Sequence, residues 1–329
     1  MKAIALISGG LDSILAAKVI QQQGVEVIPL HFNIPFCHKA KEPGKQAGLV
    51  KENLGADLRS VDLSQEFLEV IKNPRYGFGS NMNPCIDCKI LMFSRAKELM
   101  PELGAQFIVT GEVLGQRPMS QHKQALSVIP RRASLEGLVV RPLCAKLLPE
   151  TIPEKEGWVR RDGLLDFSGR TRKPQFDLAQ NLQVKDYAQP AGGCLLTDPE
   201  FSRRLKELIA HQELSLNNIE LLKVGRHFRI ATDARLAVGR NESEDNELLG
   251  LAQPADYIFR PPETAGPTSL GRGNFTEDMI ELACRITCRY CDKAFGATVK
   301  ISYYKAPDKE ERLVEVLPAD KTELLKLRV

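Results

Sequence analysis

Short apolar runs alternate with amphipathic stretches over the first half of the chain. Residues 3–7 form an apolar run, and a helical pattern follows from residue 14 to a stop at Gly24. Further strands are predicted at residues 25–32, 58–63 and 106–111, and helices at residues 47–54, 67–71 and 90–99. Because strands alternate with helices, we predict an α/β fold with a doubly wound parallel sheet.

This rhythm is lost in the second half of the chain. Residues 138–143 form one more predicted strand, and residues 149–199 are rich in Pro, Gly and charge, as expected of a connecting or substrate-facing region. Residues 227–231 and 235–239 flank a Thr-Asp-Ala turn as a hairpin, and residues 276–290 have a helical pattern. Helix and strand without the βαβ rhythm predict a second domain, of the α+β type.

The composition is that of a globular protein, with 43% hydrophobic and 26% charged residues among 329. A chain of this length is expected to form two cores. We predict domains over residues 1–175 and 205–329, with a linker over residues 176–204. No stretch approaches the roughly 18 uncharged apolar residues of a membrane span, and the first residues lack the pattern of a leader peptide. We therefore expect a cytoplasmic protein with no membrane partner.

The formal net charge of +3 does not by itself indicate nucleic-acid binding, because attraction to phosphates depends on a local basic face. Residues 117–173 carry 12 Lys and Arg against 6 Asp and Glu, a surplus of 12 − 6 = 6 positive charges. This segment could face a polyanion or form an ordinary solvated surface.

A glycine-rich string lies between the first predicted strand and helix: Ser8, Gly9, Gly10, Leu11, Asp12 and Ser13. Such a loop points backbone N–H groups and the positive end of a helix at an anion. The hydroxyls of Ser8 and Ser13 can donate, whereas Asp12 would repel phosphate unless it binds magnesium or fixes the loop. The string resembles the SGGxDS loop of the PP-loop ATP pyrophosphatases and lacks the Gly-Lys-Ser/Thr ending of a Walker A loop.

This resemblance implies that residues 8–13 bind ATP and that ATP is cleaved to AMP and pyrophosphate. Asp12 is predicted as a catalytic residue, and its role as a ligand of Mg²⁺ is a hypothesis based on its carboxylate. The adenylyl group would pass to a substrate oxygen, and the family's acceptors differ widely. Thr110 and Gly111 stand where similar proteins have a second nucleotide-side loop. His31 ends a predicted strand, and we interpret it as structural.

Two of the eight cysteines, Cys85 and Cys88, form a CxxC before a predicted helix. A helix N-terminus favours thiolate by about 0.3–1 kcal/mol. A CxxC alone is compatible with a redox pair, half of a zinc site, part of an iron–sulfur site, or two unremarkable cysteines.

The segment from Asn83 to Lys89 resembles the NPxxxCN stretch of bacterial tRNA 2-thiouridine synthases, with Cys88 at their first active-site cysteine and Lys89 in place of the last Asn. The string PAGGCLL around Cys194 resembles their second cysteine motif. Cys85 stands where Asp is usual, which resembles variant thiolases whose three cysteines hold a 4Fe-4S cluster. The resemblance implies Cys85, Cys88 and Cys194 as cluster ligands, with one iron left open for hydrosulfide.

A mechanism without a cluster stays open, in which Cys194 carries a persulfide that Cys88 resolves, with Cys88 and Cys194 as the catalytic cysteines. Both mechanisms predict a tRNA sulfurtransferase that adenylates a uridine carbonyl oxygen and replaces AMP by sulfur, with tRNA and a sulfide or persulfide donor as partners. A small-molecule synthetase with structural cysteines is the alternative. An RNA-binding module with a decayed ATP site is disfavoured by the intact string at residues 8–13.

The C-terminal region carries a second resemblance. The string GRHFR from Gly225, the hairpin and the string VGRN from Val238 resemble the RNA-binding domain of NFACT proteins, over about residues 220–305. The resemblance implies Arg226, Arg229 and Arg240 as donors to RNA phosphates.

Three further cysteines, Cys284, Cys288 and Cys291, have the CxxxCxxC spacing of radical-SAM enzymes. That motif belongs on a loop after the first strand of a β/α barrel, whereas these residues lie in a helical pattern and share one face. We interpret them as buried small residues, with a structural metal as the alternative.

Overall fold

The computed structural model describes residues 1–36, 43–187, 194–292, 297–308 and 310–329. The chain divides into two compact units, Met1–Asp198 and Pro199–Val329. Most of the stretch predicted as a linker therefore belongs to the first unit, where helix α7 (Lys173–Asn181) packs against helix α1 (Leu11–Gln21).

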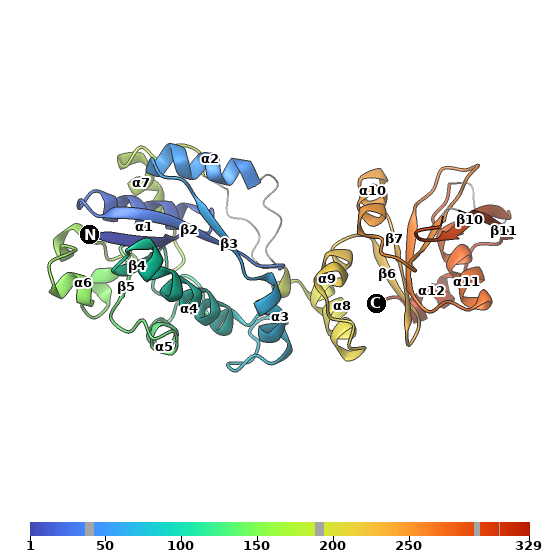
Figure 1. Cartoon of the computed structure of the whole chain (residues 1–329), viewed down its shortest axis with the longest axis horizontal. Coiled ribbons are helices and arrows are strands. Elements are labelled where there is room, and N and C mark those ends of the chain that lie inside the picture. The colour runs from blue at the N-terminus through green and yellow to red at the C-terminus, as the bar shows by residue number, and fades with distance from the viewer. Residues whose placement is uncertain (37–42, 188–193, 293–296, 309) are drawn as a thin grey trace. The chain divides into compact units, whose positions relative to one another are not determined.

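A parallel sheet forms the middle of the first unit, with the strand order β3-β2-β1-β4-β5 among the described residues (Figure 1). Its strands are β1 (Lys2–Leu6), β2 (Glu26–Asn33), β3 (Arg59–Asp62), β4 (Phe107–Thr110) and β5 (Val139–Val140). The order reverses direction at β1, because β2 lies on one side of it and β4 on the other. In open parallel sheets such a switch point leaves a crevice at the carboxyl ends of the strands, where ligands bind.

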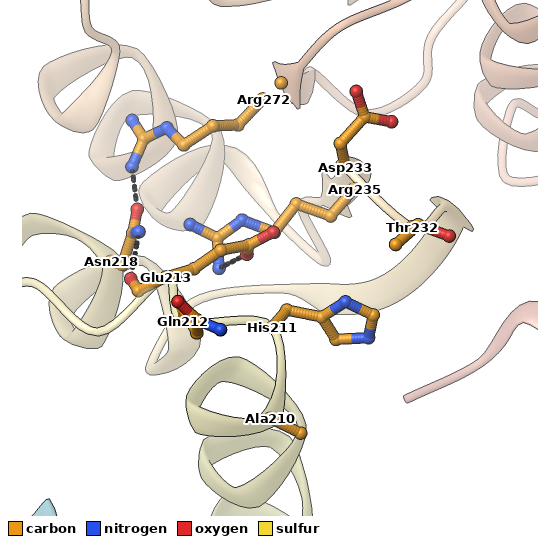
Figure 2. A pocket seen from close by; sticks show the side chains of 10 residues that line it. Ala210, His211, Gln212, Glu213, Asn218, Thr232, Asp233, Arg235 and Arg272 are labelled. Carbon is orange, nitrogen blue, oxygen red and sulfur yellow. Dashed lines mark hydrogen bonds and ion pairs between the residues drawn. The ribbon is translucent and has the colours of Figure 1, made fainter.

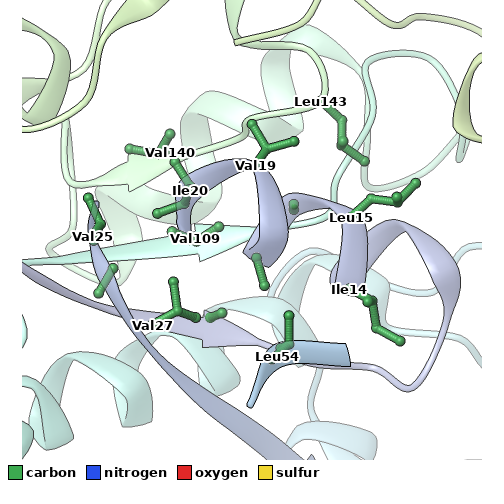
Figure 3. Packing of buried hydrophobic residues seen from close by; sticks show 14 of the residues in the cluster. Ile14, Leu15, Val19, Ile20, Val25, Val27, Leu54, Val109, Val140 and Leu143 are labelled. Atoms are coloured by element: carbon green, nitrogen blue, oxygen red, sulfur yellow. The ribbon is translucent and has the colours of Figure 1, made fainter. Parts of the chain in front are cut away.

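Helices cover both faces of this sheet. Neighbouring side chains along a strand point to opposite faces, so each strand contributes apolar residues to a core on either side. Ala3 and Ala5 belong to one core with the apolar residues of α1, of which Figure 3 shows Ile14 and Leu15. Ile4 packs with Phe93 of α4 (Cys85–Leu103) in another core. The other helices of the unit are α2 (Pro43–Leu54), α3 (Ser64–Lys72), α4 (Cys85–Leu103), α5 (Lys123–Arg132) and α6 (Ile152–Lys155). The predicted doubly wound α/β fold is confirmed.

Two elements of the first unit differ from the prediction. The strand expected at 138–143 is only Val139–Val140, because Pro142 has no N–H to give to a ladder and Arg141 turns inward to Glu112. Helix α5 was not predicted, since its sequence carries Pro130 and a run of charge that read as loop.

The second unit is built on an antiparallel sheet with the order β11-β10-β8-β9-β7-β6 in the described part of the chain. Its strands are β6 (Arg226–Ala231), β7 (Ala234–Val238), β8 (Tyr257–Arg260), β9 (Ser269–Gly273), β10 (Val299–Lys305) and β11 (Arg312–Val316). Its helices are α8 (Pro199–Ala210), α9 (Leu216–Leu222), α10 (Glu242–Leu251), α11 (Glu277–Cys288) and α12 (Lys321–Leu327). The predicted hairpin and helix correspond to β6–β7 and α11, and the α+β class is confirmed.

Candidate active site

The loop between β1 and α1 is closed by serine side chains. Ser13 Oγ donates to the carbonyl oxygen of Gly10 at 2.7 Å, and the N–H of Ser8 donates to Ser13 Oγ at 3.3 Å. Gly9 has a φ of +80°, a conformation that favours glycine. The Ser13 hydroxyl, which was predicted to donate to phosphate, therefore donates within the loop. The N-terminal end of α1 points toward the same loop.

Gly111 packs directly on the backbone of this loop. It follows β4, which pairs with β1 so that Thr110 lies opposite Leu6. A β-carbon at Gly111 would lie 2.5 Å from the carbonyl carbon and oxygen of Asp12 and from the amide nitrogen of Ser13. No side chain fits at that separation, so the two segments predicted to bind nucleotide meet backbone to backbone.

The Asp12 carboxylate is the centre of a polar group that the motif did not predict. Gln116 Nε2 donates to Asp12 Oδ2 at 2.8 Å, and Arg172 Nη2 lies 3.4 Å from Asp12 Oδ1. Behind them the buried Gln175 donates to Gln116 Oε1 at 3.1 Å. Both oxygens of the Asp12 carboxylate thus contact N–H donors, and its role as a magnesium ligand stays a prediction.

A second carboxylate, Glu112, is buried one residue beyond Gly111. Arg141 Nε donates to Glu112 Oε2 at 2.8 Å, and Lys89 Nζ donates to Glu112 Oε1. Burial alone would raise the pKa of Glu112, but the charges of Lys89 and Arg141 outweigh it and lower the pKa to about 2. The neighbouring Cys144 thiol is buried, which raises its pKa to about 11 and makes it a poor nucleophile.

Both cysteines of the CxxC lie in the first turn of α4, which begins earlier than the helix predicted after them. Helix α4 begins at Cys85, and the backbone N–H of Cys88 donates to the Pro84 carbonyl oxygen at 2.9 Å. Asp87 lies between the two cysteines. Its carboxylate accepts hydrogen bonds from the backbone N–H groups of Arg75, at 3.2 Å, and Tyr76, at 2.9 Å. This contact fixes the approach of the chain to the helix.

The segment that carries Cys194 lies beside the one that leads to Cys85. The N–H of Met82 donates to the carbonyl oxygen of Leu196 at 3.1 Å. On its other side Cys194 Sγ donates to the Phe36 carbonyl oxygen at 3.5 Å. A hydrogen bond between backbone atoms thus links two cysteine motifs that are more than a hundred positions apart in sequence.

A preformed cluster site is not found in the described residues. No group of three or more His, Cys, Asp or Glu side chains is arranged there to hold a metal ion. Residues 190–193 of the PAGGCLL string lie outside the described residues. The chain segments of Cys85, Cys88 and Cys194 are brought together, and their role as ligands of a 4Fe-4S cluster stays a prediction.

His31 has the structural contacts expected of it. Its Nδ1 lies 2.7 Å from the carbonyl oxygen of Ile7 and 3.2 Å from Gln46 Nε2. The imidazole therefore contacts the backbone at the end of β1, next to the phosphate loop.

The three arginines predicted to bind RNA differ in the contacts and the solvent exposure of their side chains. Arg226 lies over the ring of Tyr290, with 4.5 Å from its guanidinium carbon to the ring centroid. Arg229 donates to both oxygens of Glu213, at 2.8 and 3.1 Å, and its side chain is 14% exposed. Arg240 pairs with a glutamate of α10 and is 48% exposed. Arg240 thus keeps the most accessible charge of the three.

Cys284, Cys288 and Cys291 are all buried in the core between α11 and the sheet, which confirms their interpretation as small core residues. Burial raises the pKa of Cys284 and of Cys291 to about 12, and that of Cys288 above its ordinary value. Thiols that stay protonated at neutral pH are poor nucleophiles.

Replacing Cys284 by serine is expected to lower the free energy of unfolding by about 1–3 kcal/mol, because a hydroxyl buried without a partner loses its hydration. Urea denaturation measures this loss, and Cys284→Ala provides the comparison without a hydroxyl. Bound metal, assayed after purification, should be the same in both variants and in the wild type. A loss of bound metal would contradict the structural role.

No helix among the described residues is long and apolar enough to cross a membrane. Comparison with protein families gives a match in each unit. Residues 1–148 match the family described as thiamine biosynthesis protein (ThiI), and residues 225–328 match the NFACT protein RNA-binding domain. Both resemblances predicted from the sequence are confirmed.

Curated relatives match part of the chain. A tRNA-specific 2-thiouridylase of Pelobacter propionicus is 33% identical over 34% of this chain and 33% of its own length. A probable tRNA sulfurtransferase of Thermococcus kodakarensis is 31% identical over 43% of this chain and 36% of its own. The chain thus spans about a third of the length of these relatives.

Among solved structures, the U34-tRNA thiolase NcsA of Methanococcus maripaludis with its [4Fe-4S] cluster matches at 17% identity. The match has a TM-score of 0.34 and covers 68% of this chain and 73% of that one. A TM-score this low supports no conclusion about the present chain.

Proposed function

Since residues 1–148 form a ThiI-type domain and residues 225–328 an NFACT-type RNA-binding domain, we propose that the chain is a sulfurtransferase acting on a uridine of tRNA. ATP activates the base and a cysteine-borne sulfur replaces its carbonyl oxygen. One observation carries the proposal: the unit with the phosphate loop also joins, through the hydrogen bond between Met82 and Leu196, the two segments that bear Cys85, Cys88 and Cys194.

In the first step the uridine carbonyl oxygen attacks the α-phosphorus of ATP, and pyrophosphate leaves. The backbone N–H groups of Gly9, Leu11 and Asp12 and the end of α1 hold the phosphates. Asp12 would hold Mg²⁺, which neutralises charge on the phosphate oxygens when bound. Gly111 supports this step because it sets the loop against β4 without a side chain between them.

In the second step sulfur attacks the adenylated carbon, and AMP leaves with the former carbonyl oxygen. Cys88 and Cys194 are the proposed sulfur-handling residues. The terminal sulfur of a persulfide on Cys194 forms the new carbon–sulfur bond, and the Cys88 thiolate then attacks Cys194 Sγ. The resulting disulfide is reduced by an external thiol. A 4Fe-4S cluster on these cysteines and Cys85 stays a prediction, and no step is derived through it.

A buried ion pair supports the coupling of these two steps. Lys89 directly follows Cys88 in α4, and its ammonium pairs with Glu112, one residue after Gly111. The helix that presents the thiols is therefore tied to the strand end that supports the nucleotide loop. A charged pair that is 20% exposed on one side and 6% on the other holds its geometry against thermal motion better than a surface pair.

The proposal is tested with unmodified tRNA, ATP, Mg²⁺ and a persulfide donor, whose outer sulfur passes to the Cys194 thiolate, followed by mass spectrometry of the nucleosides. The wild type is expected to form a thionucleoside. Cys88→Ser and Cys194→Ser should lose at least about 1000-fold in thionucleoside yield, since a hydroxyl cannot carry the transferred sulfur, yet still release pyrophosphate. Cys284→Ala, far along the chain and buried, is the control and should keep full yield.

Absence of any thionucleoside from the wild-type reaction, with pyrophosphate released in the presence of a small-molecule acceptor, would contradict the proposal. Iron and acid-labile sulfide measured on protein purified without oxygen test the cluster separately. Iron that is present in the wild type and lost in Cys85→Ala supports the three-cysteine cluster, whereas iron-free active protein supports the persulfide.

A further inference from the structure

The second unit has a hollow that the proposed reaction does not use. It has a volume of about 520 Å³ and lies between the end of α8, the start of α9 and the turn ends of β6, β7 and β9 (Figure 2). Its polar walls include His211, Gln212, Glu213, Asn218, Arg235 and Arg272. A hollow of this size can hold one nucleotide unit.

Arg235 is the unusual member of this group. Its residue is only 6% exposed, and Nε, Nη1 and Nη2 donate no hydrogen bond to any described residue. Its carboxylate neighbour is Glu213, whose Oε2 lies 3.5 Å from Nη1. Burial lowers the pKa of Arg235 to about 10, with the charges of Arg229 and Arg272 acting in the same direction. A buried guanidinium without acceptors is costly, because its N–H groups have lost water and gained nothing.

The neighbouring arginines, by contrast, are fully matched. Both oxygens of Glu213 already accept hydrogen bonds from Arg229, and Arg235 forms no hydrogen bond with this carboxylate. Arg272 donates to Asp256 at 2.6 Å and to Asn218 at 2.6 Å. The unmatched donors are therefore confined to one side chain on the wall of the hollow.

A carboxylate on the rim limits what can enter. Asp233 also lines the hollow, and its Oδ2 accepts from Asn274 Nδ2 at 2.8 Å. A β-carbon at Gly273 would lie 1.8 Å from the Asp233 carbonyl oxygen, so the absence of a side chain there lets the two strand ends close this wall. A ligand must then present its acceptor to Arg235 and keep clear of the Asp233 side.

We propose that the hollow is a subsite for one backbone phosphate of RNA, with the Arg235 guanidinium as its donor. The planar fork of arginine matches two phosphate oxygens, which is the acceptor set that the three nitrogens of Arg235 lack. Arg235 and Arg272 fall within residues 225–328, which match an RNA-binding domain. The assignment rests on the proposed function, because it takes tRNA as the ligand of the chain.

The test compares tRNA binding by the full chain with Arg235→Met, with exposed Arg312→Met as the matched loss of one charge. Arg235→Met is expected to weaken binding at least about tenfold and to reduce the slope of log affinity against log salt by about one. Its melting temperature should equal or exceed that of the wild type, because a buried guanidinium without hydrogen-bond acceptors is removed. Arg312→Met should change the affinity less than about twofold. Arg235→Lys, which keeps the charge and loses the fork, should fall between, and it carries the test if the methionine variant does not fold.

Equal tRNA binding by the wild type and Arg235→Met would overturn this subsite and leave the proposed function intact. Failure of the wild type to bind tRNA at all would overturn both. Inorganic phosphate that raises the melting temperature of the wild type, but not of Arg235→Met, while the two bind tRNA equally, would identify a site for a small free anion and would also overturn the RNA assignment.

Discussion

Replacing Gly111 with alanine is expected to lower the rate of pyrophosphate release by about 100-fold or more. The new β-carbon would lie 2.5 Å from backbone atoms of Asp12 and Ser13, so β4 and the phosphate loop must move apart. A displacement of about 1 Å in a positioned catalytic group can cost about two orders of magnitude in rate. The measurement is pyrophosphate release with ATP and tRNA at saturating concentrations.

Gly48→Ala is the matched control for this substitution. Gly48 lies within α2, and a β-carbon there would meet no atom within 4 Å. Because alanine is the better helix former, the control should keep its activity and gain about 0.5–1 kcal/mol of stability. If Gly111→Ala released pyrophosphate at the wild-type rate, the close packing of β4 on the loop would have no part in ATP cleavage.

Replacing Glu112 with glutamine is expected to lower the free energy of unfolding by about 3–5 kcal/mol at pH 7. The amide would leave Lys89 and Arg141 buried without a counter-charge. Urea denaturation measures the loss. Glu69→Gln, which removes one member of an exposed pair with Lys72, is the control and should cost less than about 1 kcal/mol.

The same residue gives a dependence on pH. The pKa of Glu112 is lowered from 4.5 to about 2 in the folded chain. A carboxylate with a lowered pKa binds fewer protons in the folded than in the unfolded state, so its stabilisation, about 3 kcal/mol, is complete above about pH 4.5. It is lost as the pH falls through about 2. The difference between wild type and Glu112→Gln should therefore be smaller at pH 3 than at pH 7, and an unchanged difference would refute the ion pair.

The sequence predicted those parts of the fold whose signal is local. The apolar run at residues 3–7 and the glycine string after it identify β1, the phosphate loop and α1, and the alternation of strands with helices predicts the sheet. The hairpin of β6 and β7 and the helix α11 were also predicted from pattern alone. The helical pattern after Cys85 and Cys88 predicted that they lie near a helix N-terminus, although the helix itself begins at Cys85.

What could not be predicted depends on contacts between distant segments. Gln116 contacts Asp12 from 104 positions away in sequence, and Gln175 contacts Gln116 from 59 positions away. Neither glutamine belongs to a sequence motif. Glu112 had a weak signal, as a charged residue inside an apolar stretch after β4. Lys89 departed from the family's usual residue, and only its pairing with Glu112 explains that choice. Arg235 looked like any charge in a hairpin until its burial was known.

The anchoring of α4 has a consequence for how substrate is chosen. Its first turns are held by Asp87 on one side and by Lys89 on the other, so the helix cannot rotate to bring a thiol to a distant base without breaking a buried pair. Under the proposed function, we therefore expect the reacting carbon to move to the sulfur. Selection among uridines would then depend on which nucleotide the folded RNA can extend into a fixed position, and a base held in a stable duplex would be disfavoured by the free energy needed to extrude it.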